Sequence, residues 1–206
     1  MVRKIADGIP LDILQTDLEN LRQKALEMGA TEAKIITTDM IVVDERVRAK
    51  CLNPKCPSYG TNGNCPPYAP DLDMVRKIIG KYKYAIFVFT RFQPEALSQN
   101  ERHPLQIPGG TKSHEIIARI EAEAFHNGYY LAMGLGAGPC KPLFCADAAC
   151  GVLKGEGCRQ GLKARYSMES WGLDAFLMAT RAGWDVYPGG ASGVPYMVTL
   201  GLVLVY

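Results

Sequence analysis

Hydrophobic side chains near the start of the chain recur at steps of three and four residues, which is the spacing of one helix face. The residues concerned are Leu11, Leu14, Leu18, Leu21 and Ala25. Gly29 follows them, and glycine is a common stop just beyond the last helical turn. We therefore expect residues 1–30 to carry one amphipathic helix.

Beyond residue 30, strand-like and helix-like segments alternate. Runs of β-branched and apolar residues predict strands at 33–43 (one bent strand or two short ones), 84–90, 129–135, 184–187 and 196–206. Helical spacing and cap residues predict helices from Asp71 to Gly80, over 113–126, and from Ser167 to Gly183. The segment 91–111 is rich in proline and glycine, which predicts a long surface loop, either a plain connection or a lid.

This alternation predicts an α/β fold, a single-domain sandwich of helices around a mixed β-sheet. We expect the last strand to be antiparallel and to lie at an edge of the sheet. Each cysteine-rich loop would then follow the C-terminal end of a strand and precede a helix. Ligands bind at that edge of open α/β sheets, because loops converge there and helix amides point toward it.

The composition agrees with one buried core. The chain has 206 residues, of which 48% are hydrophobic and 21% charged, and neither a linker nor a repeat divides it. We therefore expect one domain over 1–206. The formal charge is only +2, so no basic field would concentrate nucleic acid or an anionic membrane, and neither is an expected partner.

The N-terminus has two basic residues but no apolar run behind them, so we expect no secretory signal and a cytoplasmic location. The longest apolar stretch, 196–206, has 11 residues, which is short of the roughly 20 that span a bilayer. In a reducing cytosol thiols stay free. An odd number of clustered cysteines then indicates metal binding more than disulfides.

All seven cysteines fall in two short windows. The first window, in the loop 51–70, holds Cys51, Cys56 and Cys65; the second, in the loop 138–166, holds Cys140, Cys145, Cys150 and Cys158. Proline, glycine and asparagine fill the first window, which has no apolar core, so a bound metal would supply the missing organising energy. The seven cysteines are the candidate metal and cofactor ligands, whereas no catalytic residue stands out.

Four thiolates in the second window match the usual complement of one iron–sulfur cluster. The same number fits a tetrahedral zinc site, but structural zinc sites usually contain a close Cys-x2-4-Cys pair, and neither window has a two-residue gap. Four-residue gaps occur in plant-type iron–sulfur proteins. The spacing therefore favours iron–sulfur, with zinc as the alternative.

The second window is locally basic, which would stabilise an anionic cluster. The charged residues are Lys141, Lys154, Arg159, Lys163 and Arg165, against Asp147 and Glu156. A solvated basic loop is the alternative interpretation. Three glycines before Cys140 would let backbone amides approach cluster sulfurs, or they are simple turn residues. They are Gly134, Gly136 and Gly138.

Two further residue types near the windows call for an interpretation. Tyr59, Tyr68 and Tyr166 either line a substrate pocket or pack over a cluster. The histidines lie outside both windows, and we interpret them as surface residues rather than ligands; they are His103, His114 and His126.

Taken together, the motifs resemble those of the predicted metal-binding family known as domain of unknown function 2284, over residues 30–206. The motifs are Cys51-x4-Cys56-x2-Tyr59-Gly60-x4-Cys65-Pro66-Pro67, then Gly138-Pro139-Cys140, Cys145, Cys150 and Cys158, then Ser167-Met168-Glu169-x2-Gly172-Leu173-Asp174. The resemblance implies a metal-binding, iron–sulfur, cytoplasmic protein of mostly anaerobic organisms. In that family the fourth cysteine is often followed by His-Pro; here Arg159-Gln160 follows, so no role of that histidine carries over.

Three hypotheses follow for the function. The first is an electron-transfer protein with two [4Fe-4S] clusters, one in each window. The second is a small redox enzyme, in which a three-cysteine cluster keeps one iron open for a substrate. The third is a zinc-stapled interaction module without redox chemistry. The partner is accordingly a redox protein or a small molecule. The sequence leaves open whether the protein is an enzyme and what its oligomeric state is.

Overall fold

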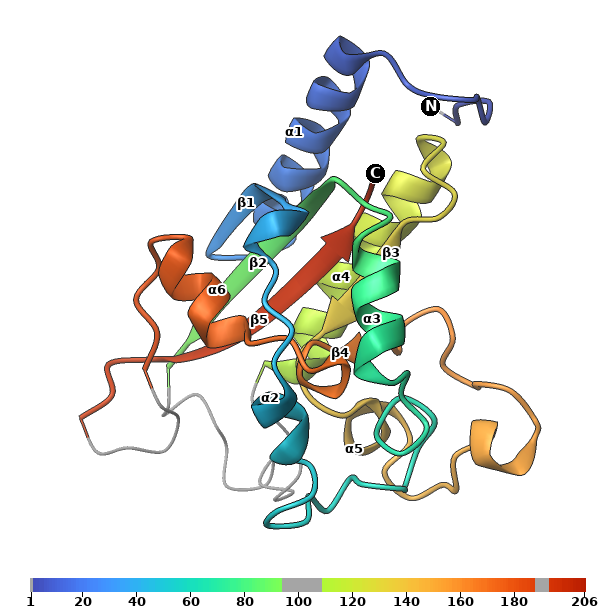
Figure 1. The fold of residues 1–206 in the computed structure, drawn as a ribbon, viewed down its shortest axis with the longest axis vertical. Coiled ribbons are helices and arrows are strands. Elements are labelled where there is room, and N and C mark those ends of the chain that lie inside the picture. The colour runs from blue at the N-terminus through green and yellow to red at the C-terminus, as the bar shows by residue number, and fades with distance from the viewer. Residues whose placement is uncertain (1, 94–108, 188–192) are drawn as a thin grey trace.

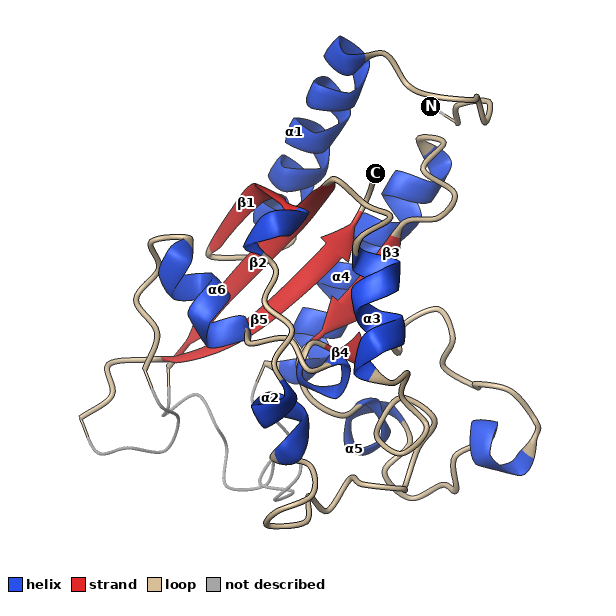
Figure 2. Ribbon diagram, in the orientation of Figure 1, coloured by secondary structure: helices blue, strands red, loops and turns tan. Residues whose placement is uncertain are grey.

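A five-stranded mixed sheet forms the centre of the protein (Figures 1 and 2). The computed structural model describes residues 2–93, 109–187 and 193–206. The strand order is β1-β2-β5-β3-β4; only β3 and β4 pair in parallel. The strands are β1 (Glu32–Thr37), β2 (Tyr84–Phe92), β3 (Met133–Gly136), β4 (Tyr166–Ser167) and β5 (Met197–Leu204).

Helices pack on both faces of this sheet, and each face has its own apolar core. On one face Ile86, Val88 and Val203 pack with residues of α1 and α4. On the other face Phe87 and Leu202 pack with residues of α3 and α6. The helices are α1 (Leu11–Glu27), α2 (Glu45–Ala49), α3 (Leu72–Ile79), α4 (Gly110–His126), α5 (Cys140–Phe144) and α6 (Ala175–Arg181). The predicted single-domain α/β sandwich is confirmed.

Several predicted boundaries agree with local hydrogen bonds. The Asp71 carboxylate accepts a bond of 2.8 Å from the Met74 amide, which caps the start of α3. Gly29 and Gly183 follow α1 and α6 with φ of 95° and 78°, a left-handed conformation in which glycine is least strained. The expected helix stops therefore occur at the predicted glycines.

The C-terminal strand differs from its prediction. It is antiparallel as expected, but β5 lies in the middle of the sheet, between β2 and β3, and not at an edge. Residues 199–205 are all buried, because helices cover both faces of this strand. A continuous apolar run of this kind is typical of a strand covered on both sides.

The predicted helix from Ser167 to Gly183 is wrong in its first half. Ser167 lies in β4, and a single 3-10 turn (Glu169–Trp171) follows. Gly172 then adopts φ of 72°, which ends the turn, and the Asp174 carboxylate caps α6 by accepting from the Leu177 amide at 2.9 Å. Two local signals, a left-handed glycine and a capping aspartate, therefore interrupt the apolar periodicity.

Three other predicted strands differ from the structure: two are shorter than predicted, and one does not form. The stretch 33–43 is one strand that ends at Thr37 and continues into a 3-10 turn (Thr38–Met40). The stretch 129–135 is extended only from Met133. The described residues 184–187 form no strand; instead the Trp184 ring covers the sheet, 4.9 Å from Phe87 between ring centroids. Most of the predicted loop 91–111 falls outside the described residues.

Among the helices in the described part of the chain, none is long and apolar enough to cross a bilayer.

Candidate metal centre

The four cysteines of the second window line one pocket at the C-terminal end of β3. The chain leaves β3 through Gly138, whose φ is 72°, and Cys140 is the first residue of α5. The cysteines are Cys140, Cys145, Cys150 and Cys158. Cys140 and Cys158, which are 18 positions apart in the sequence, thus line the same pocket. The second window follows the C-terminal end of a strand, as predicted.

The first window reaches the same end of the sheet by a different route from the one predicted. It does not follow a strand directly, because β1 runs antiparallel to β2 and ends beside Tyr84, at the opposite end of the sheet. The intervening residues pass back along the sheet, where Val43 forms a bridge with Leu173. The short helix α2 then leads into Cys51.

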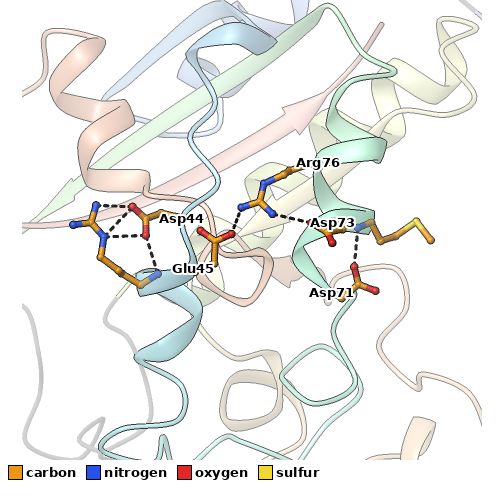
Figure 3. A network of polar contacts seen from close by, with 7 residues as sticks. Asp44, Glu45, Asp71, Asp73 and Arg76 are labelled. Atoms are coloured by element: carbon orange, nitrogen blue, oxygen red, sulfur yellow. Dashed lines mark hydrogen bonds and ion pairs between the residues drawn. The ribbon is translucent and has the colours of Figure 1, made fainter.

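Ion pairs tie the two flanks of the first window together (Figure 3). The guanidinium of Arg76 on α3 pairs with Glu45 on α2 and also with Asp73, at 3.1 Å. Arg48, at the end of α2, donates a hydrogen bond of 2.7 Å to the Pro70 carbonyl. The loop 51–70 is therefore closed at its base by α2 and α3, although exposed pairs of this kind add little stability individually.

The two windows touch one another through an asparagine pair. The Asn64 side-chain amide donates to Cys140 Sγ at 3.6 Å, and Cys140 Sγ donates to Asn62 Oδ1 at 3.8 Å. Asn62 is buried, with 1% of its surface exposed, and it also lines the four-cysteine pocket. Side chains of the first window thus form part of the wall of the second.

Close packing at Gly63 adds a second contact between the windows. A Cβ built on Gly63 would lie 2.5 Å from Cγ1 of Val152, a distance that real side chains do not tolerate. Gly63 does not have a positive φ, so alanine is excluded there by packing and not by backbone strain. The glycine therefore permits the approach of one window to the other.

Replacing Gly63 by alanine should accordingly destabilise the protein by roughly 1–2 kcal/mol, because it overpacks this contact. Adding Val152→Ala should recover most of the loss, since Val152 is 42% exposed and its methyl groups make the clash. Urea unfolding of the two single variants and the double variant measures the coupling. Additive losses would mean that the windows are not in contact at this point.

Burial disfavours ionisation of the two innermost thiols. It raises the pKa of Cys140 to about 12, and the neighbouring thiols add to the effect, Cys65 foremost. Burial likewise raises the pKa of Cys65 to about 11. At Cys150 burial is outweighed by backbone amides, that of Gly63 first, and the pKa is lowered. Thiolates crowded in this way repel one another unless a cation lies between them.

The chemistry of this donor set fits a thiophilic metal centre, because four thiols line one pocket and a fifth, that of Cys65, interacts with Cys140. The thiols do not stand in ligating positions: among the described residues, no three His, Cys, Asp or Glu side chains are arranged to hold a metal ion. The space between the four side chains is about 20 Å³. This is the room of about one water molecule, so the side chains must rotate apart around any cluster.

The expected basic surplus around the second window is partly neutralised. Lys163 pairs with Glu115 at 3.6 Å, and Arg165 pairs with Glu121 at 2.8 Å, both on α4. Arg159 lines the four-cysteine pocket but pairs with Glu156 at 2.6 Å. Lys141 also lines the pocket and donates to the Ala146 carbonyl at 3.4 Å. The cations that bear directly on the pocket are therefore Lys141 and Arg159.

The prediction that His114 is a surface residue is wrong. His114 lies on α4 with 0% of its surface exposed, directly beneath the second window. Its Nδ1 accepts from the Arg165 amide at 3.2 Å, so the proton sits on Nε2, 3.3 Å from the Gly138 carbonyl. Burial lowers the pKa of this imidazole. His114 thus braces both ends of the second window. His126 is exposed as predicted, and His103 lies outside the described residues.

The glycines before Cys140 serve packing against α4. A Cβ on Gly134 would lie 2.6 Å from Cγ2 of Ile117, and one on Gly136 would lie 3.0 Å from the His114 ring. Gly134 and Gly136 therefore make room for side chains of α4, and not for cluster sulfurs as expected. Gly138 alone is a turn glycine.

The three tyrosines near the windows do not line the four-cysteine pocket as the structure describes it. Tyr166 stacks near Trp171, with ring centroids 5.9 Å apart, and Lys55 lies over the ring of Tyr59. Tyr68 is exposed. Sequence reasoning missed Asn62 and Asn64; the signal for them is two asparagines within the eight-residue gap before Cys65.

Comparison with known proteins finds one family, which is described as metal-binding. The pattern of one family, described as predicted metal-binding protein (DUF2284), matches residues 34–205. Neither a curated protein nor a solved structure matches the chain. The matched range contains both cysteine windows and four complete strands of the sheet. The chain therefore belongs to the DUF2284 family of predicted metal-binding proteins.

Proposed function

We propose that the protein is an iron–sulfur protein with two [4Fe-4S] clusters and that it acts in redox chemistry. The observation that carries the proposal is the convergence of four cysteines on one pocket, with the first window packed against its wall. Cys140, Cys145, Cys150 and Cys158 would hold one cluster, and Cys51, Cys56 and Cys65 would hold the other. Such clusters supply one-electron transfer, at a potential that the protein sets by charge and burial.

The four-cysteine site is the better candidate for electron transfer. Its thiols complete the coordination of a cluster, so no iron would be left for a substrate. Lys141 and Arg159 at its edge would partly compensate the charge of a thiolate-ligated cluster. Asn64, which donates to Cys140 Sγ, adds a hydrogen bond to a ligand sulfur. Both effects raise the potential of a cluster.

The three-cysteine site differs because one coordination position would be left for another ligand. The thiol of Cys51 lies close enough to the Arg48 guanidinium for the two charges to interact, and the same holds for Cys65. The Nε of Arg48 is buried, and among the described residues it has no hydrogen-bond partner. A half-buried guanidinium with one free inner donor is suited to an anionic ligand. This supports a small redox enzyme in which the open position takes a small anionic substrate.

The contact between the windows supports electron transfer from one site to the other. Of the thiols that raise the pKa of Cys140, the one with the largest effect is Cys65 of the first window. Asn62 and Asn64 of the first window both hydrogen-bond to Cys140 Sγ of the second. Two clusters held in this way would exchange electrons over a short distance, so one could supply the other.

The paramagnetic spectrum of the reduced protein tests the open position. Adding sulfide or a small thiol anaerobically should change one of two cluster signals and leave the other unchanged, because only one site has an iron without a cysteine ligand. Arg48→Gln should weaken that response, whereas Arg46→Gln on the exposed side of α2 should not. Two signals that both stay unchanged would contradict the enzyme role and leave electron transfer as the function.

The alternative is a zinc-stapled interaction module. Four thiols around a small pocket fit tetrahedral zinc as well as they fit a cluster. A colourless protein that contains zinc and no sulfide would establish this alternative in place of the redox role.

A further inference from the structure

A second cavity lies at the end of the sheet opposite to the cysteine windows. Its walls come from the residues just before β2 and β3, from the chain after β5, and from the segment before α1. Its volume is about 730 Å³. That is within the range of pockets that bind small organic molecules. No cysteine lines the cavity among the described residues, so it is separate from the candidate metal centre.

Aromatic and aliphatic side chains form most of the wall. The lining side chains of this kind include Ile9, Tyr82, Tyr129, Tyr130, Leu131 and Tyr206. Tyr130 and Leu131 are 51% and 64% exposed, so the cavity wall presents apolar surface to solvent at this turn. A planar apolar group would cover this exposed surface, with rings available on more than one side.

Hydrogen bonds hold the inner wall in place. The Tyr129 hydroxyl donates to Asp17 Oδ2 at 2.7 Å, and its ring meets that of Tyr206 edge-on, with centroids 6.1 Å apart. The Tyr82 hydroxyl donates to the Leu131 carbonyl. Arg3 pairs with Asp17 and so fastens the segment that supplies Ile9. The cavity is thus largely formed before any ligand enters, which lowers the cost of binding.

The charged side chains among the described residues that line the cavity have one sign. Lys81 and Lys83 line it and are exposed, and none of its described lining residues is acidic. Burial raises the pKa of Tyr82, and the negative charge of Glu121 adds to this effect. The Glu121 carboxylate already accepts hydrogen bonds from Arg165 and from the Gly134 amide. An anionic group at the edge of the cavity would therefore meet two lysines, with no acidic side chain among the described residues of the wall.

We propose that this cavity is a binding site for a planar aromatic anion of small-molecule size. Its rings lie between the tyrosines and Leu131, and its carboxylate or sulfonate faces Lys81 and Lys83. The site is independent of the cysteine windows and of the metal that they take.

Calorimetric titration of the full chain with three naphthalene compounds tests this site. Naphthalene-2-carboxylate should bind at one saturable site and more tightly than neutral 2-naphthol, with 2-naphthylmethylammonium weakest. The double variant Lys81→Glu/Lys83→Glu should weaken the binding of the carboxylate about tenfold and change the affinity for 2-naphthol by less than about twofold. Leu131→Arg should weaken the binding of 2-naphthol and of the ammonium compound, because it places a cation on the apolar wall.

Two exposed residues elsewhere serve as matched controls. Lys112→Glu on α4 reverses a lysine outside the cavity, and Phe176→Arg on α6 places an arginine at another exposed apolar position; both should leave all three affinities unchanged. The proposal is overturned if no saturable binding occurs, if the three compounds bind equally, or if the controls act like the cavity variants. It is also overturned if Leu131→Arg converts a dimer to a monomer, since a second copy of the chain would then occupy the cavity.

Discussion

Replacing Cys158 by alanine should remove about half of the bound iron and leave the other half in place, because the two windows would hold separate clusters. Cys158 is the most suitable position for this experiment, since it is the exposed member of the four-cysteine group. Its loss should cost little folding energy of its own. Anaerobic iron and sulfide analysis after reconstitution measures the result, and the spectrum of the reduced variant identifies the cluster that remains.

Cys51→Ala is the matched experiment on the first window. It should also remove about half of the iron, but the surviving signal should be the one that is lost in the Cys158 variant. Loss of all iron in both variants would show that the windows share a single site. Cys65 and Cys140 are less informative, because the two thiols interact electrostatically across the contact between the windows.

His114→Ala should destabilise the protein by about 3 kcal/mol, through the cavity left in the core and through two unpaired backbone groups. The groups are the Arg165 amide and the Gly138 carbonyl, and the ring also meets Phe144 edge-on at 5.6 Å. Because these contacts hold both ends of the second window, the variant should also lose metal faster to a chelator. Urea unfolding and the rate of metal release measure the two effects.

The same helix supplies the control. His126→Ala, at an exposed position, should change the free energy of unfolding by less than about 0.5 kcal/mol. His114→Gln should recover part of the loss, since its amide can accept from one backbone group and donate to the other. If His114→Ala were as stable as His126→Ala, the bracing role would be wrong.

Local sequence patterns predicted most of the fold, and the failures have physical causes. Capping aspartates and stop glycines defined α1 and α3 because these signals act within one helical turn. The position of β5 depends on which strands pair with it, and its own residues carry only an indirect sign, burial on both faces. Apolar spacing from Ser167 predicts too long a helix, because Gly172 and the capping Asp174 interrupt it.

The candidate site was predicted by residue type but not by arrangement. Clustered cysteines indicated metal binding, and the family agrees. The way in which the first window reaches the second depends on pairs far apart in the sequence, such as Arg76 with Glu45, which no local pattern contains. His114 had a readable signal, since it lies three residues before Ile117 on the buried face of α4.

The central claim is that both cysteine windows bind iron–sulfur clusters, and metal analysis of the anaerobically purified protein tests it most directly. Two [4Fe-4S] clusters predict about eight iron atoms and about eight sulfides per chain, with a brown colour that bleaches on reduction. One or two zinc atoms per chain, without sulfide and without colour, would contradict it.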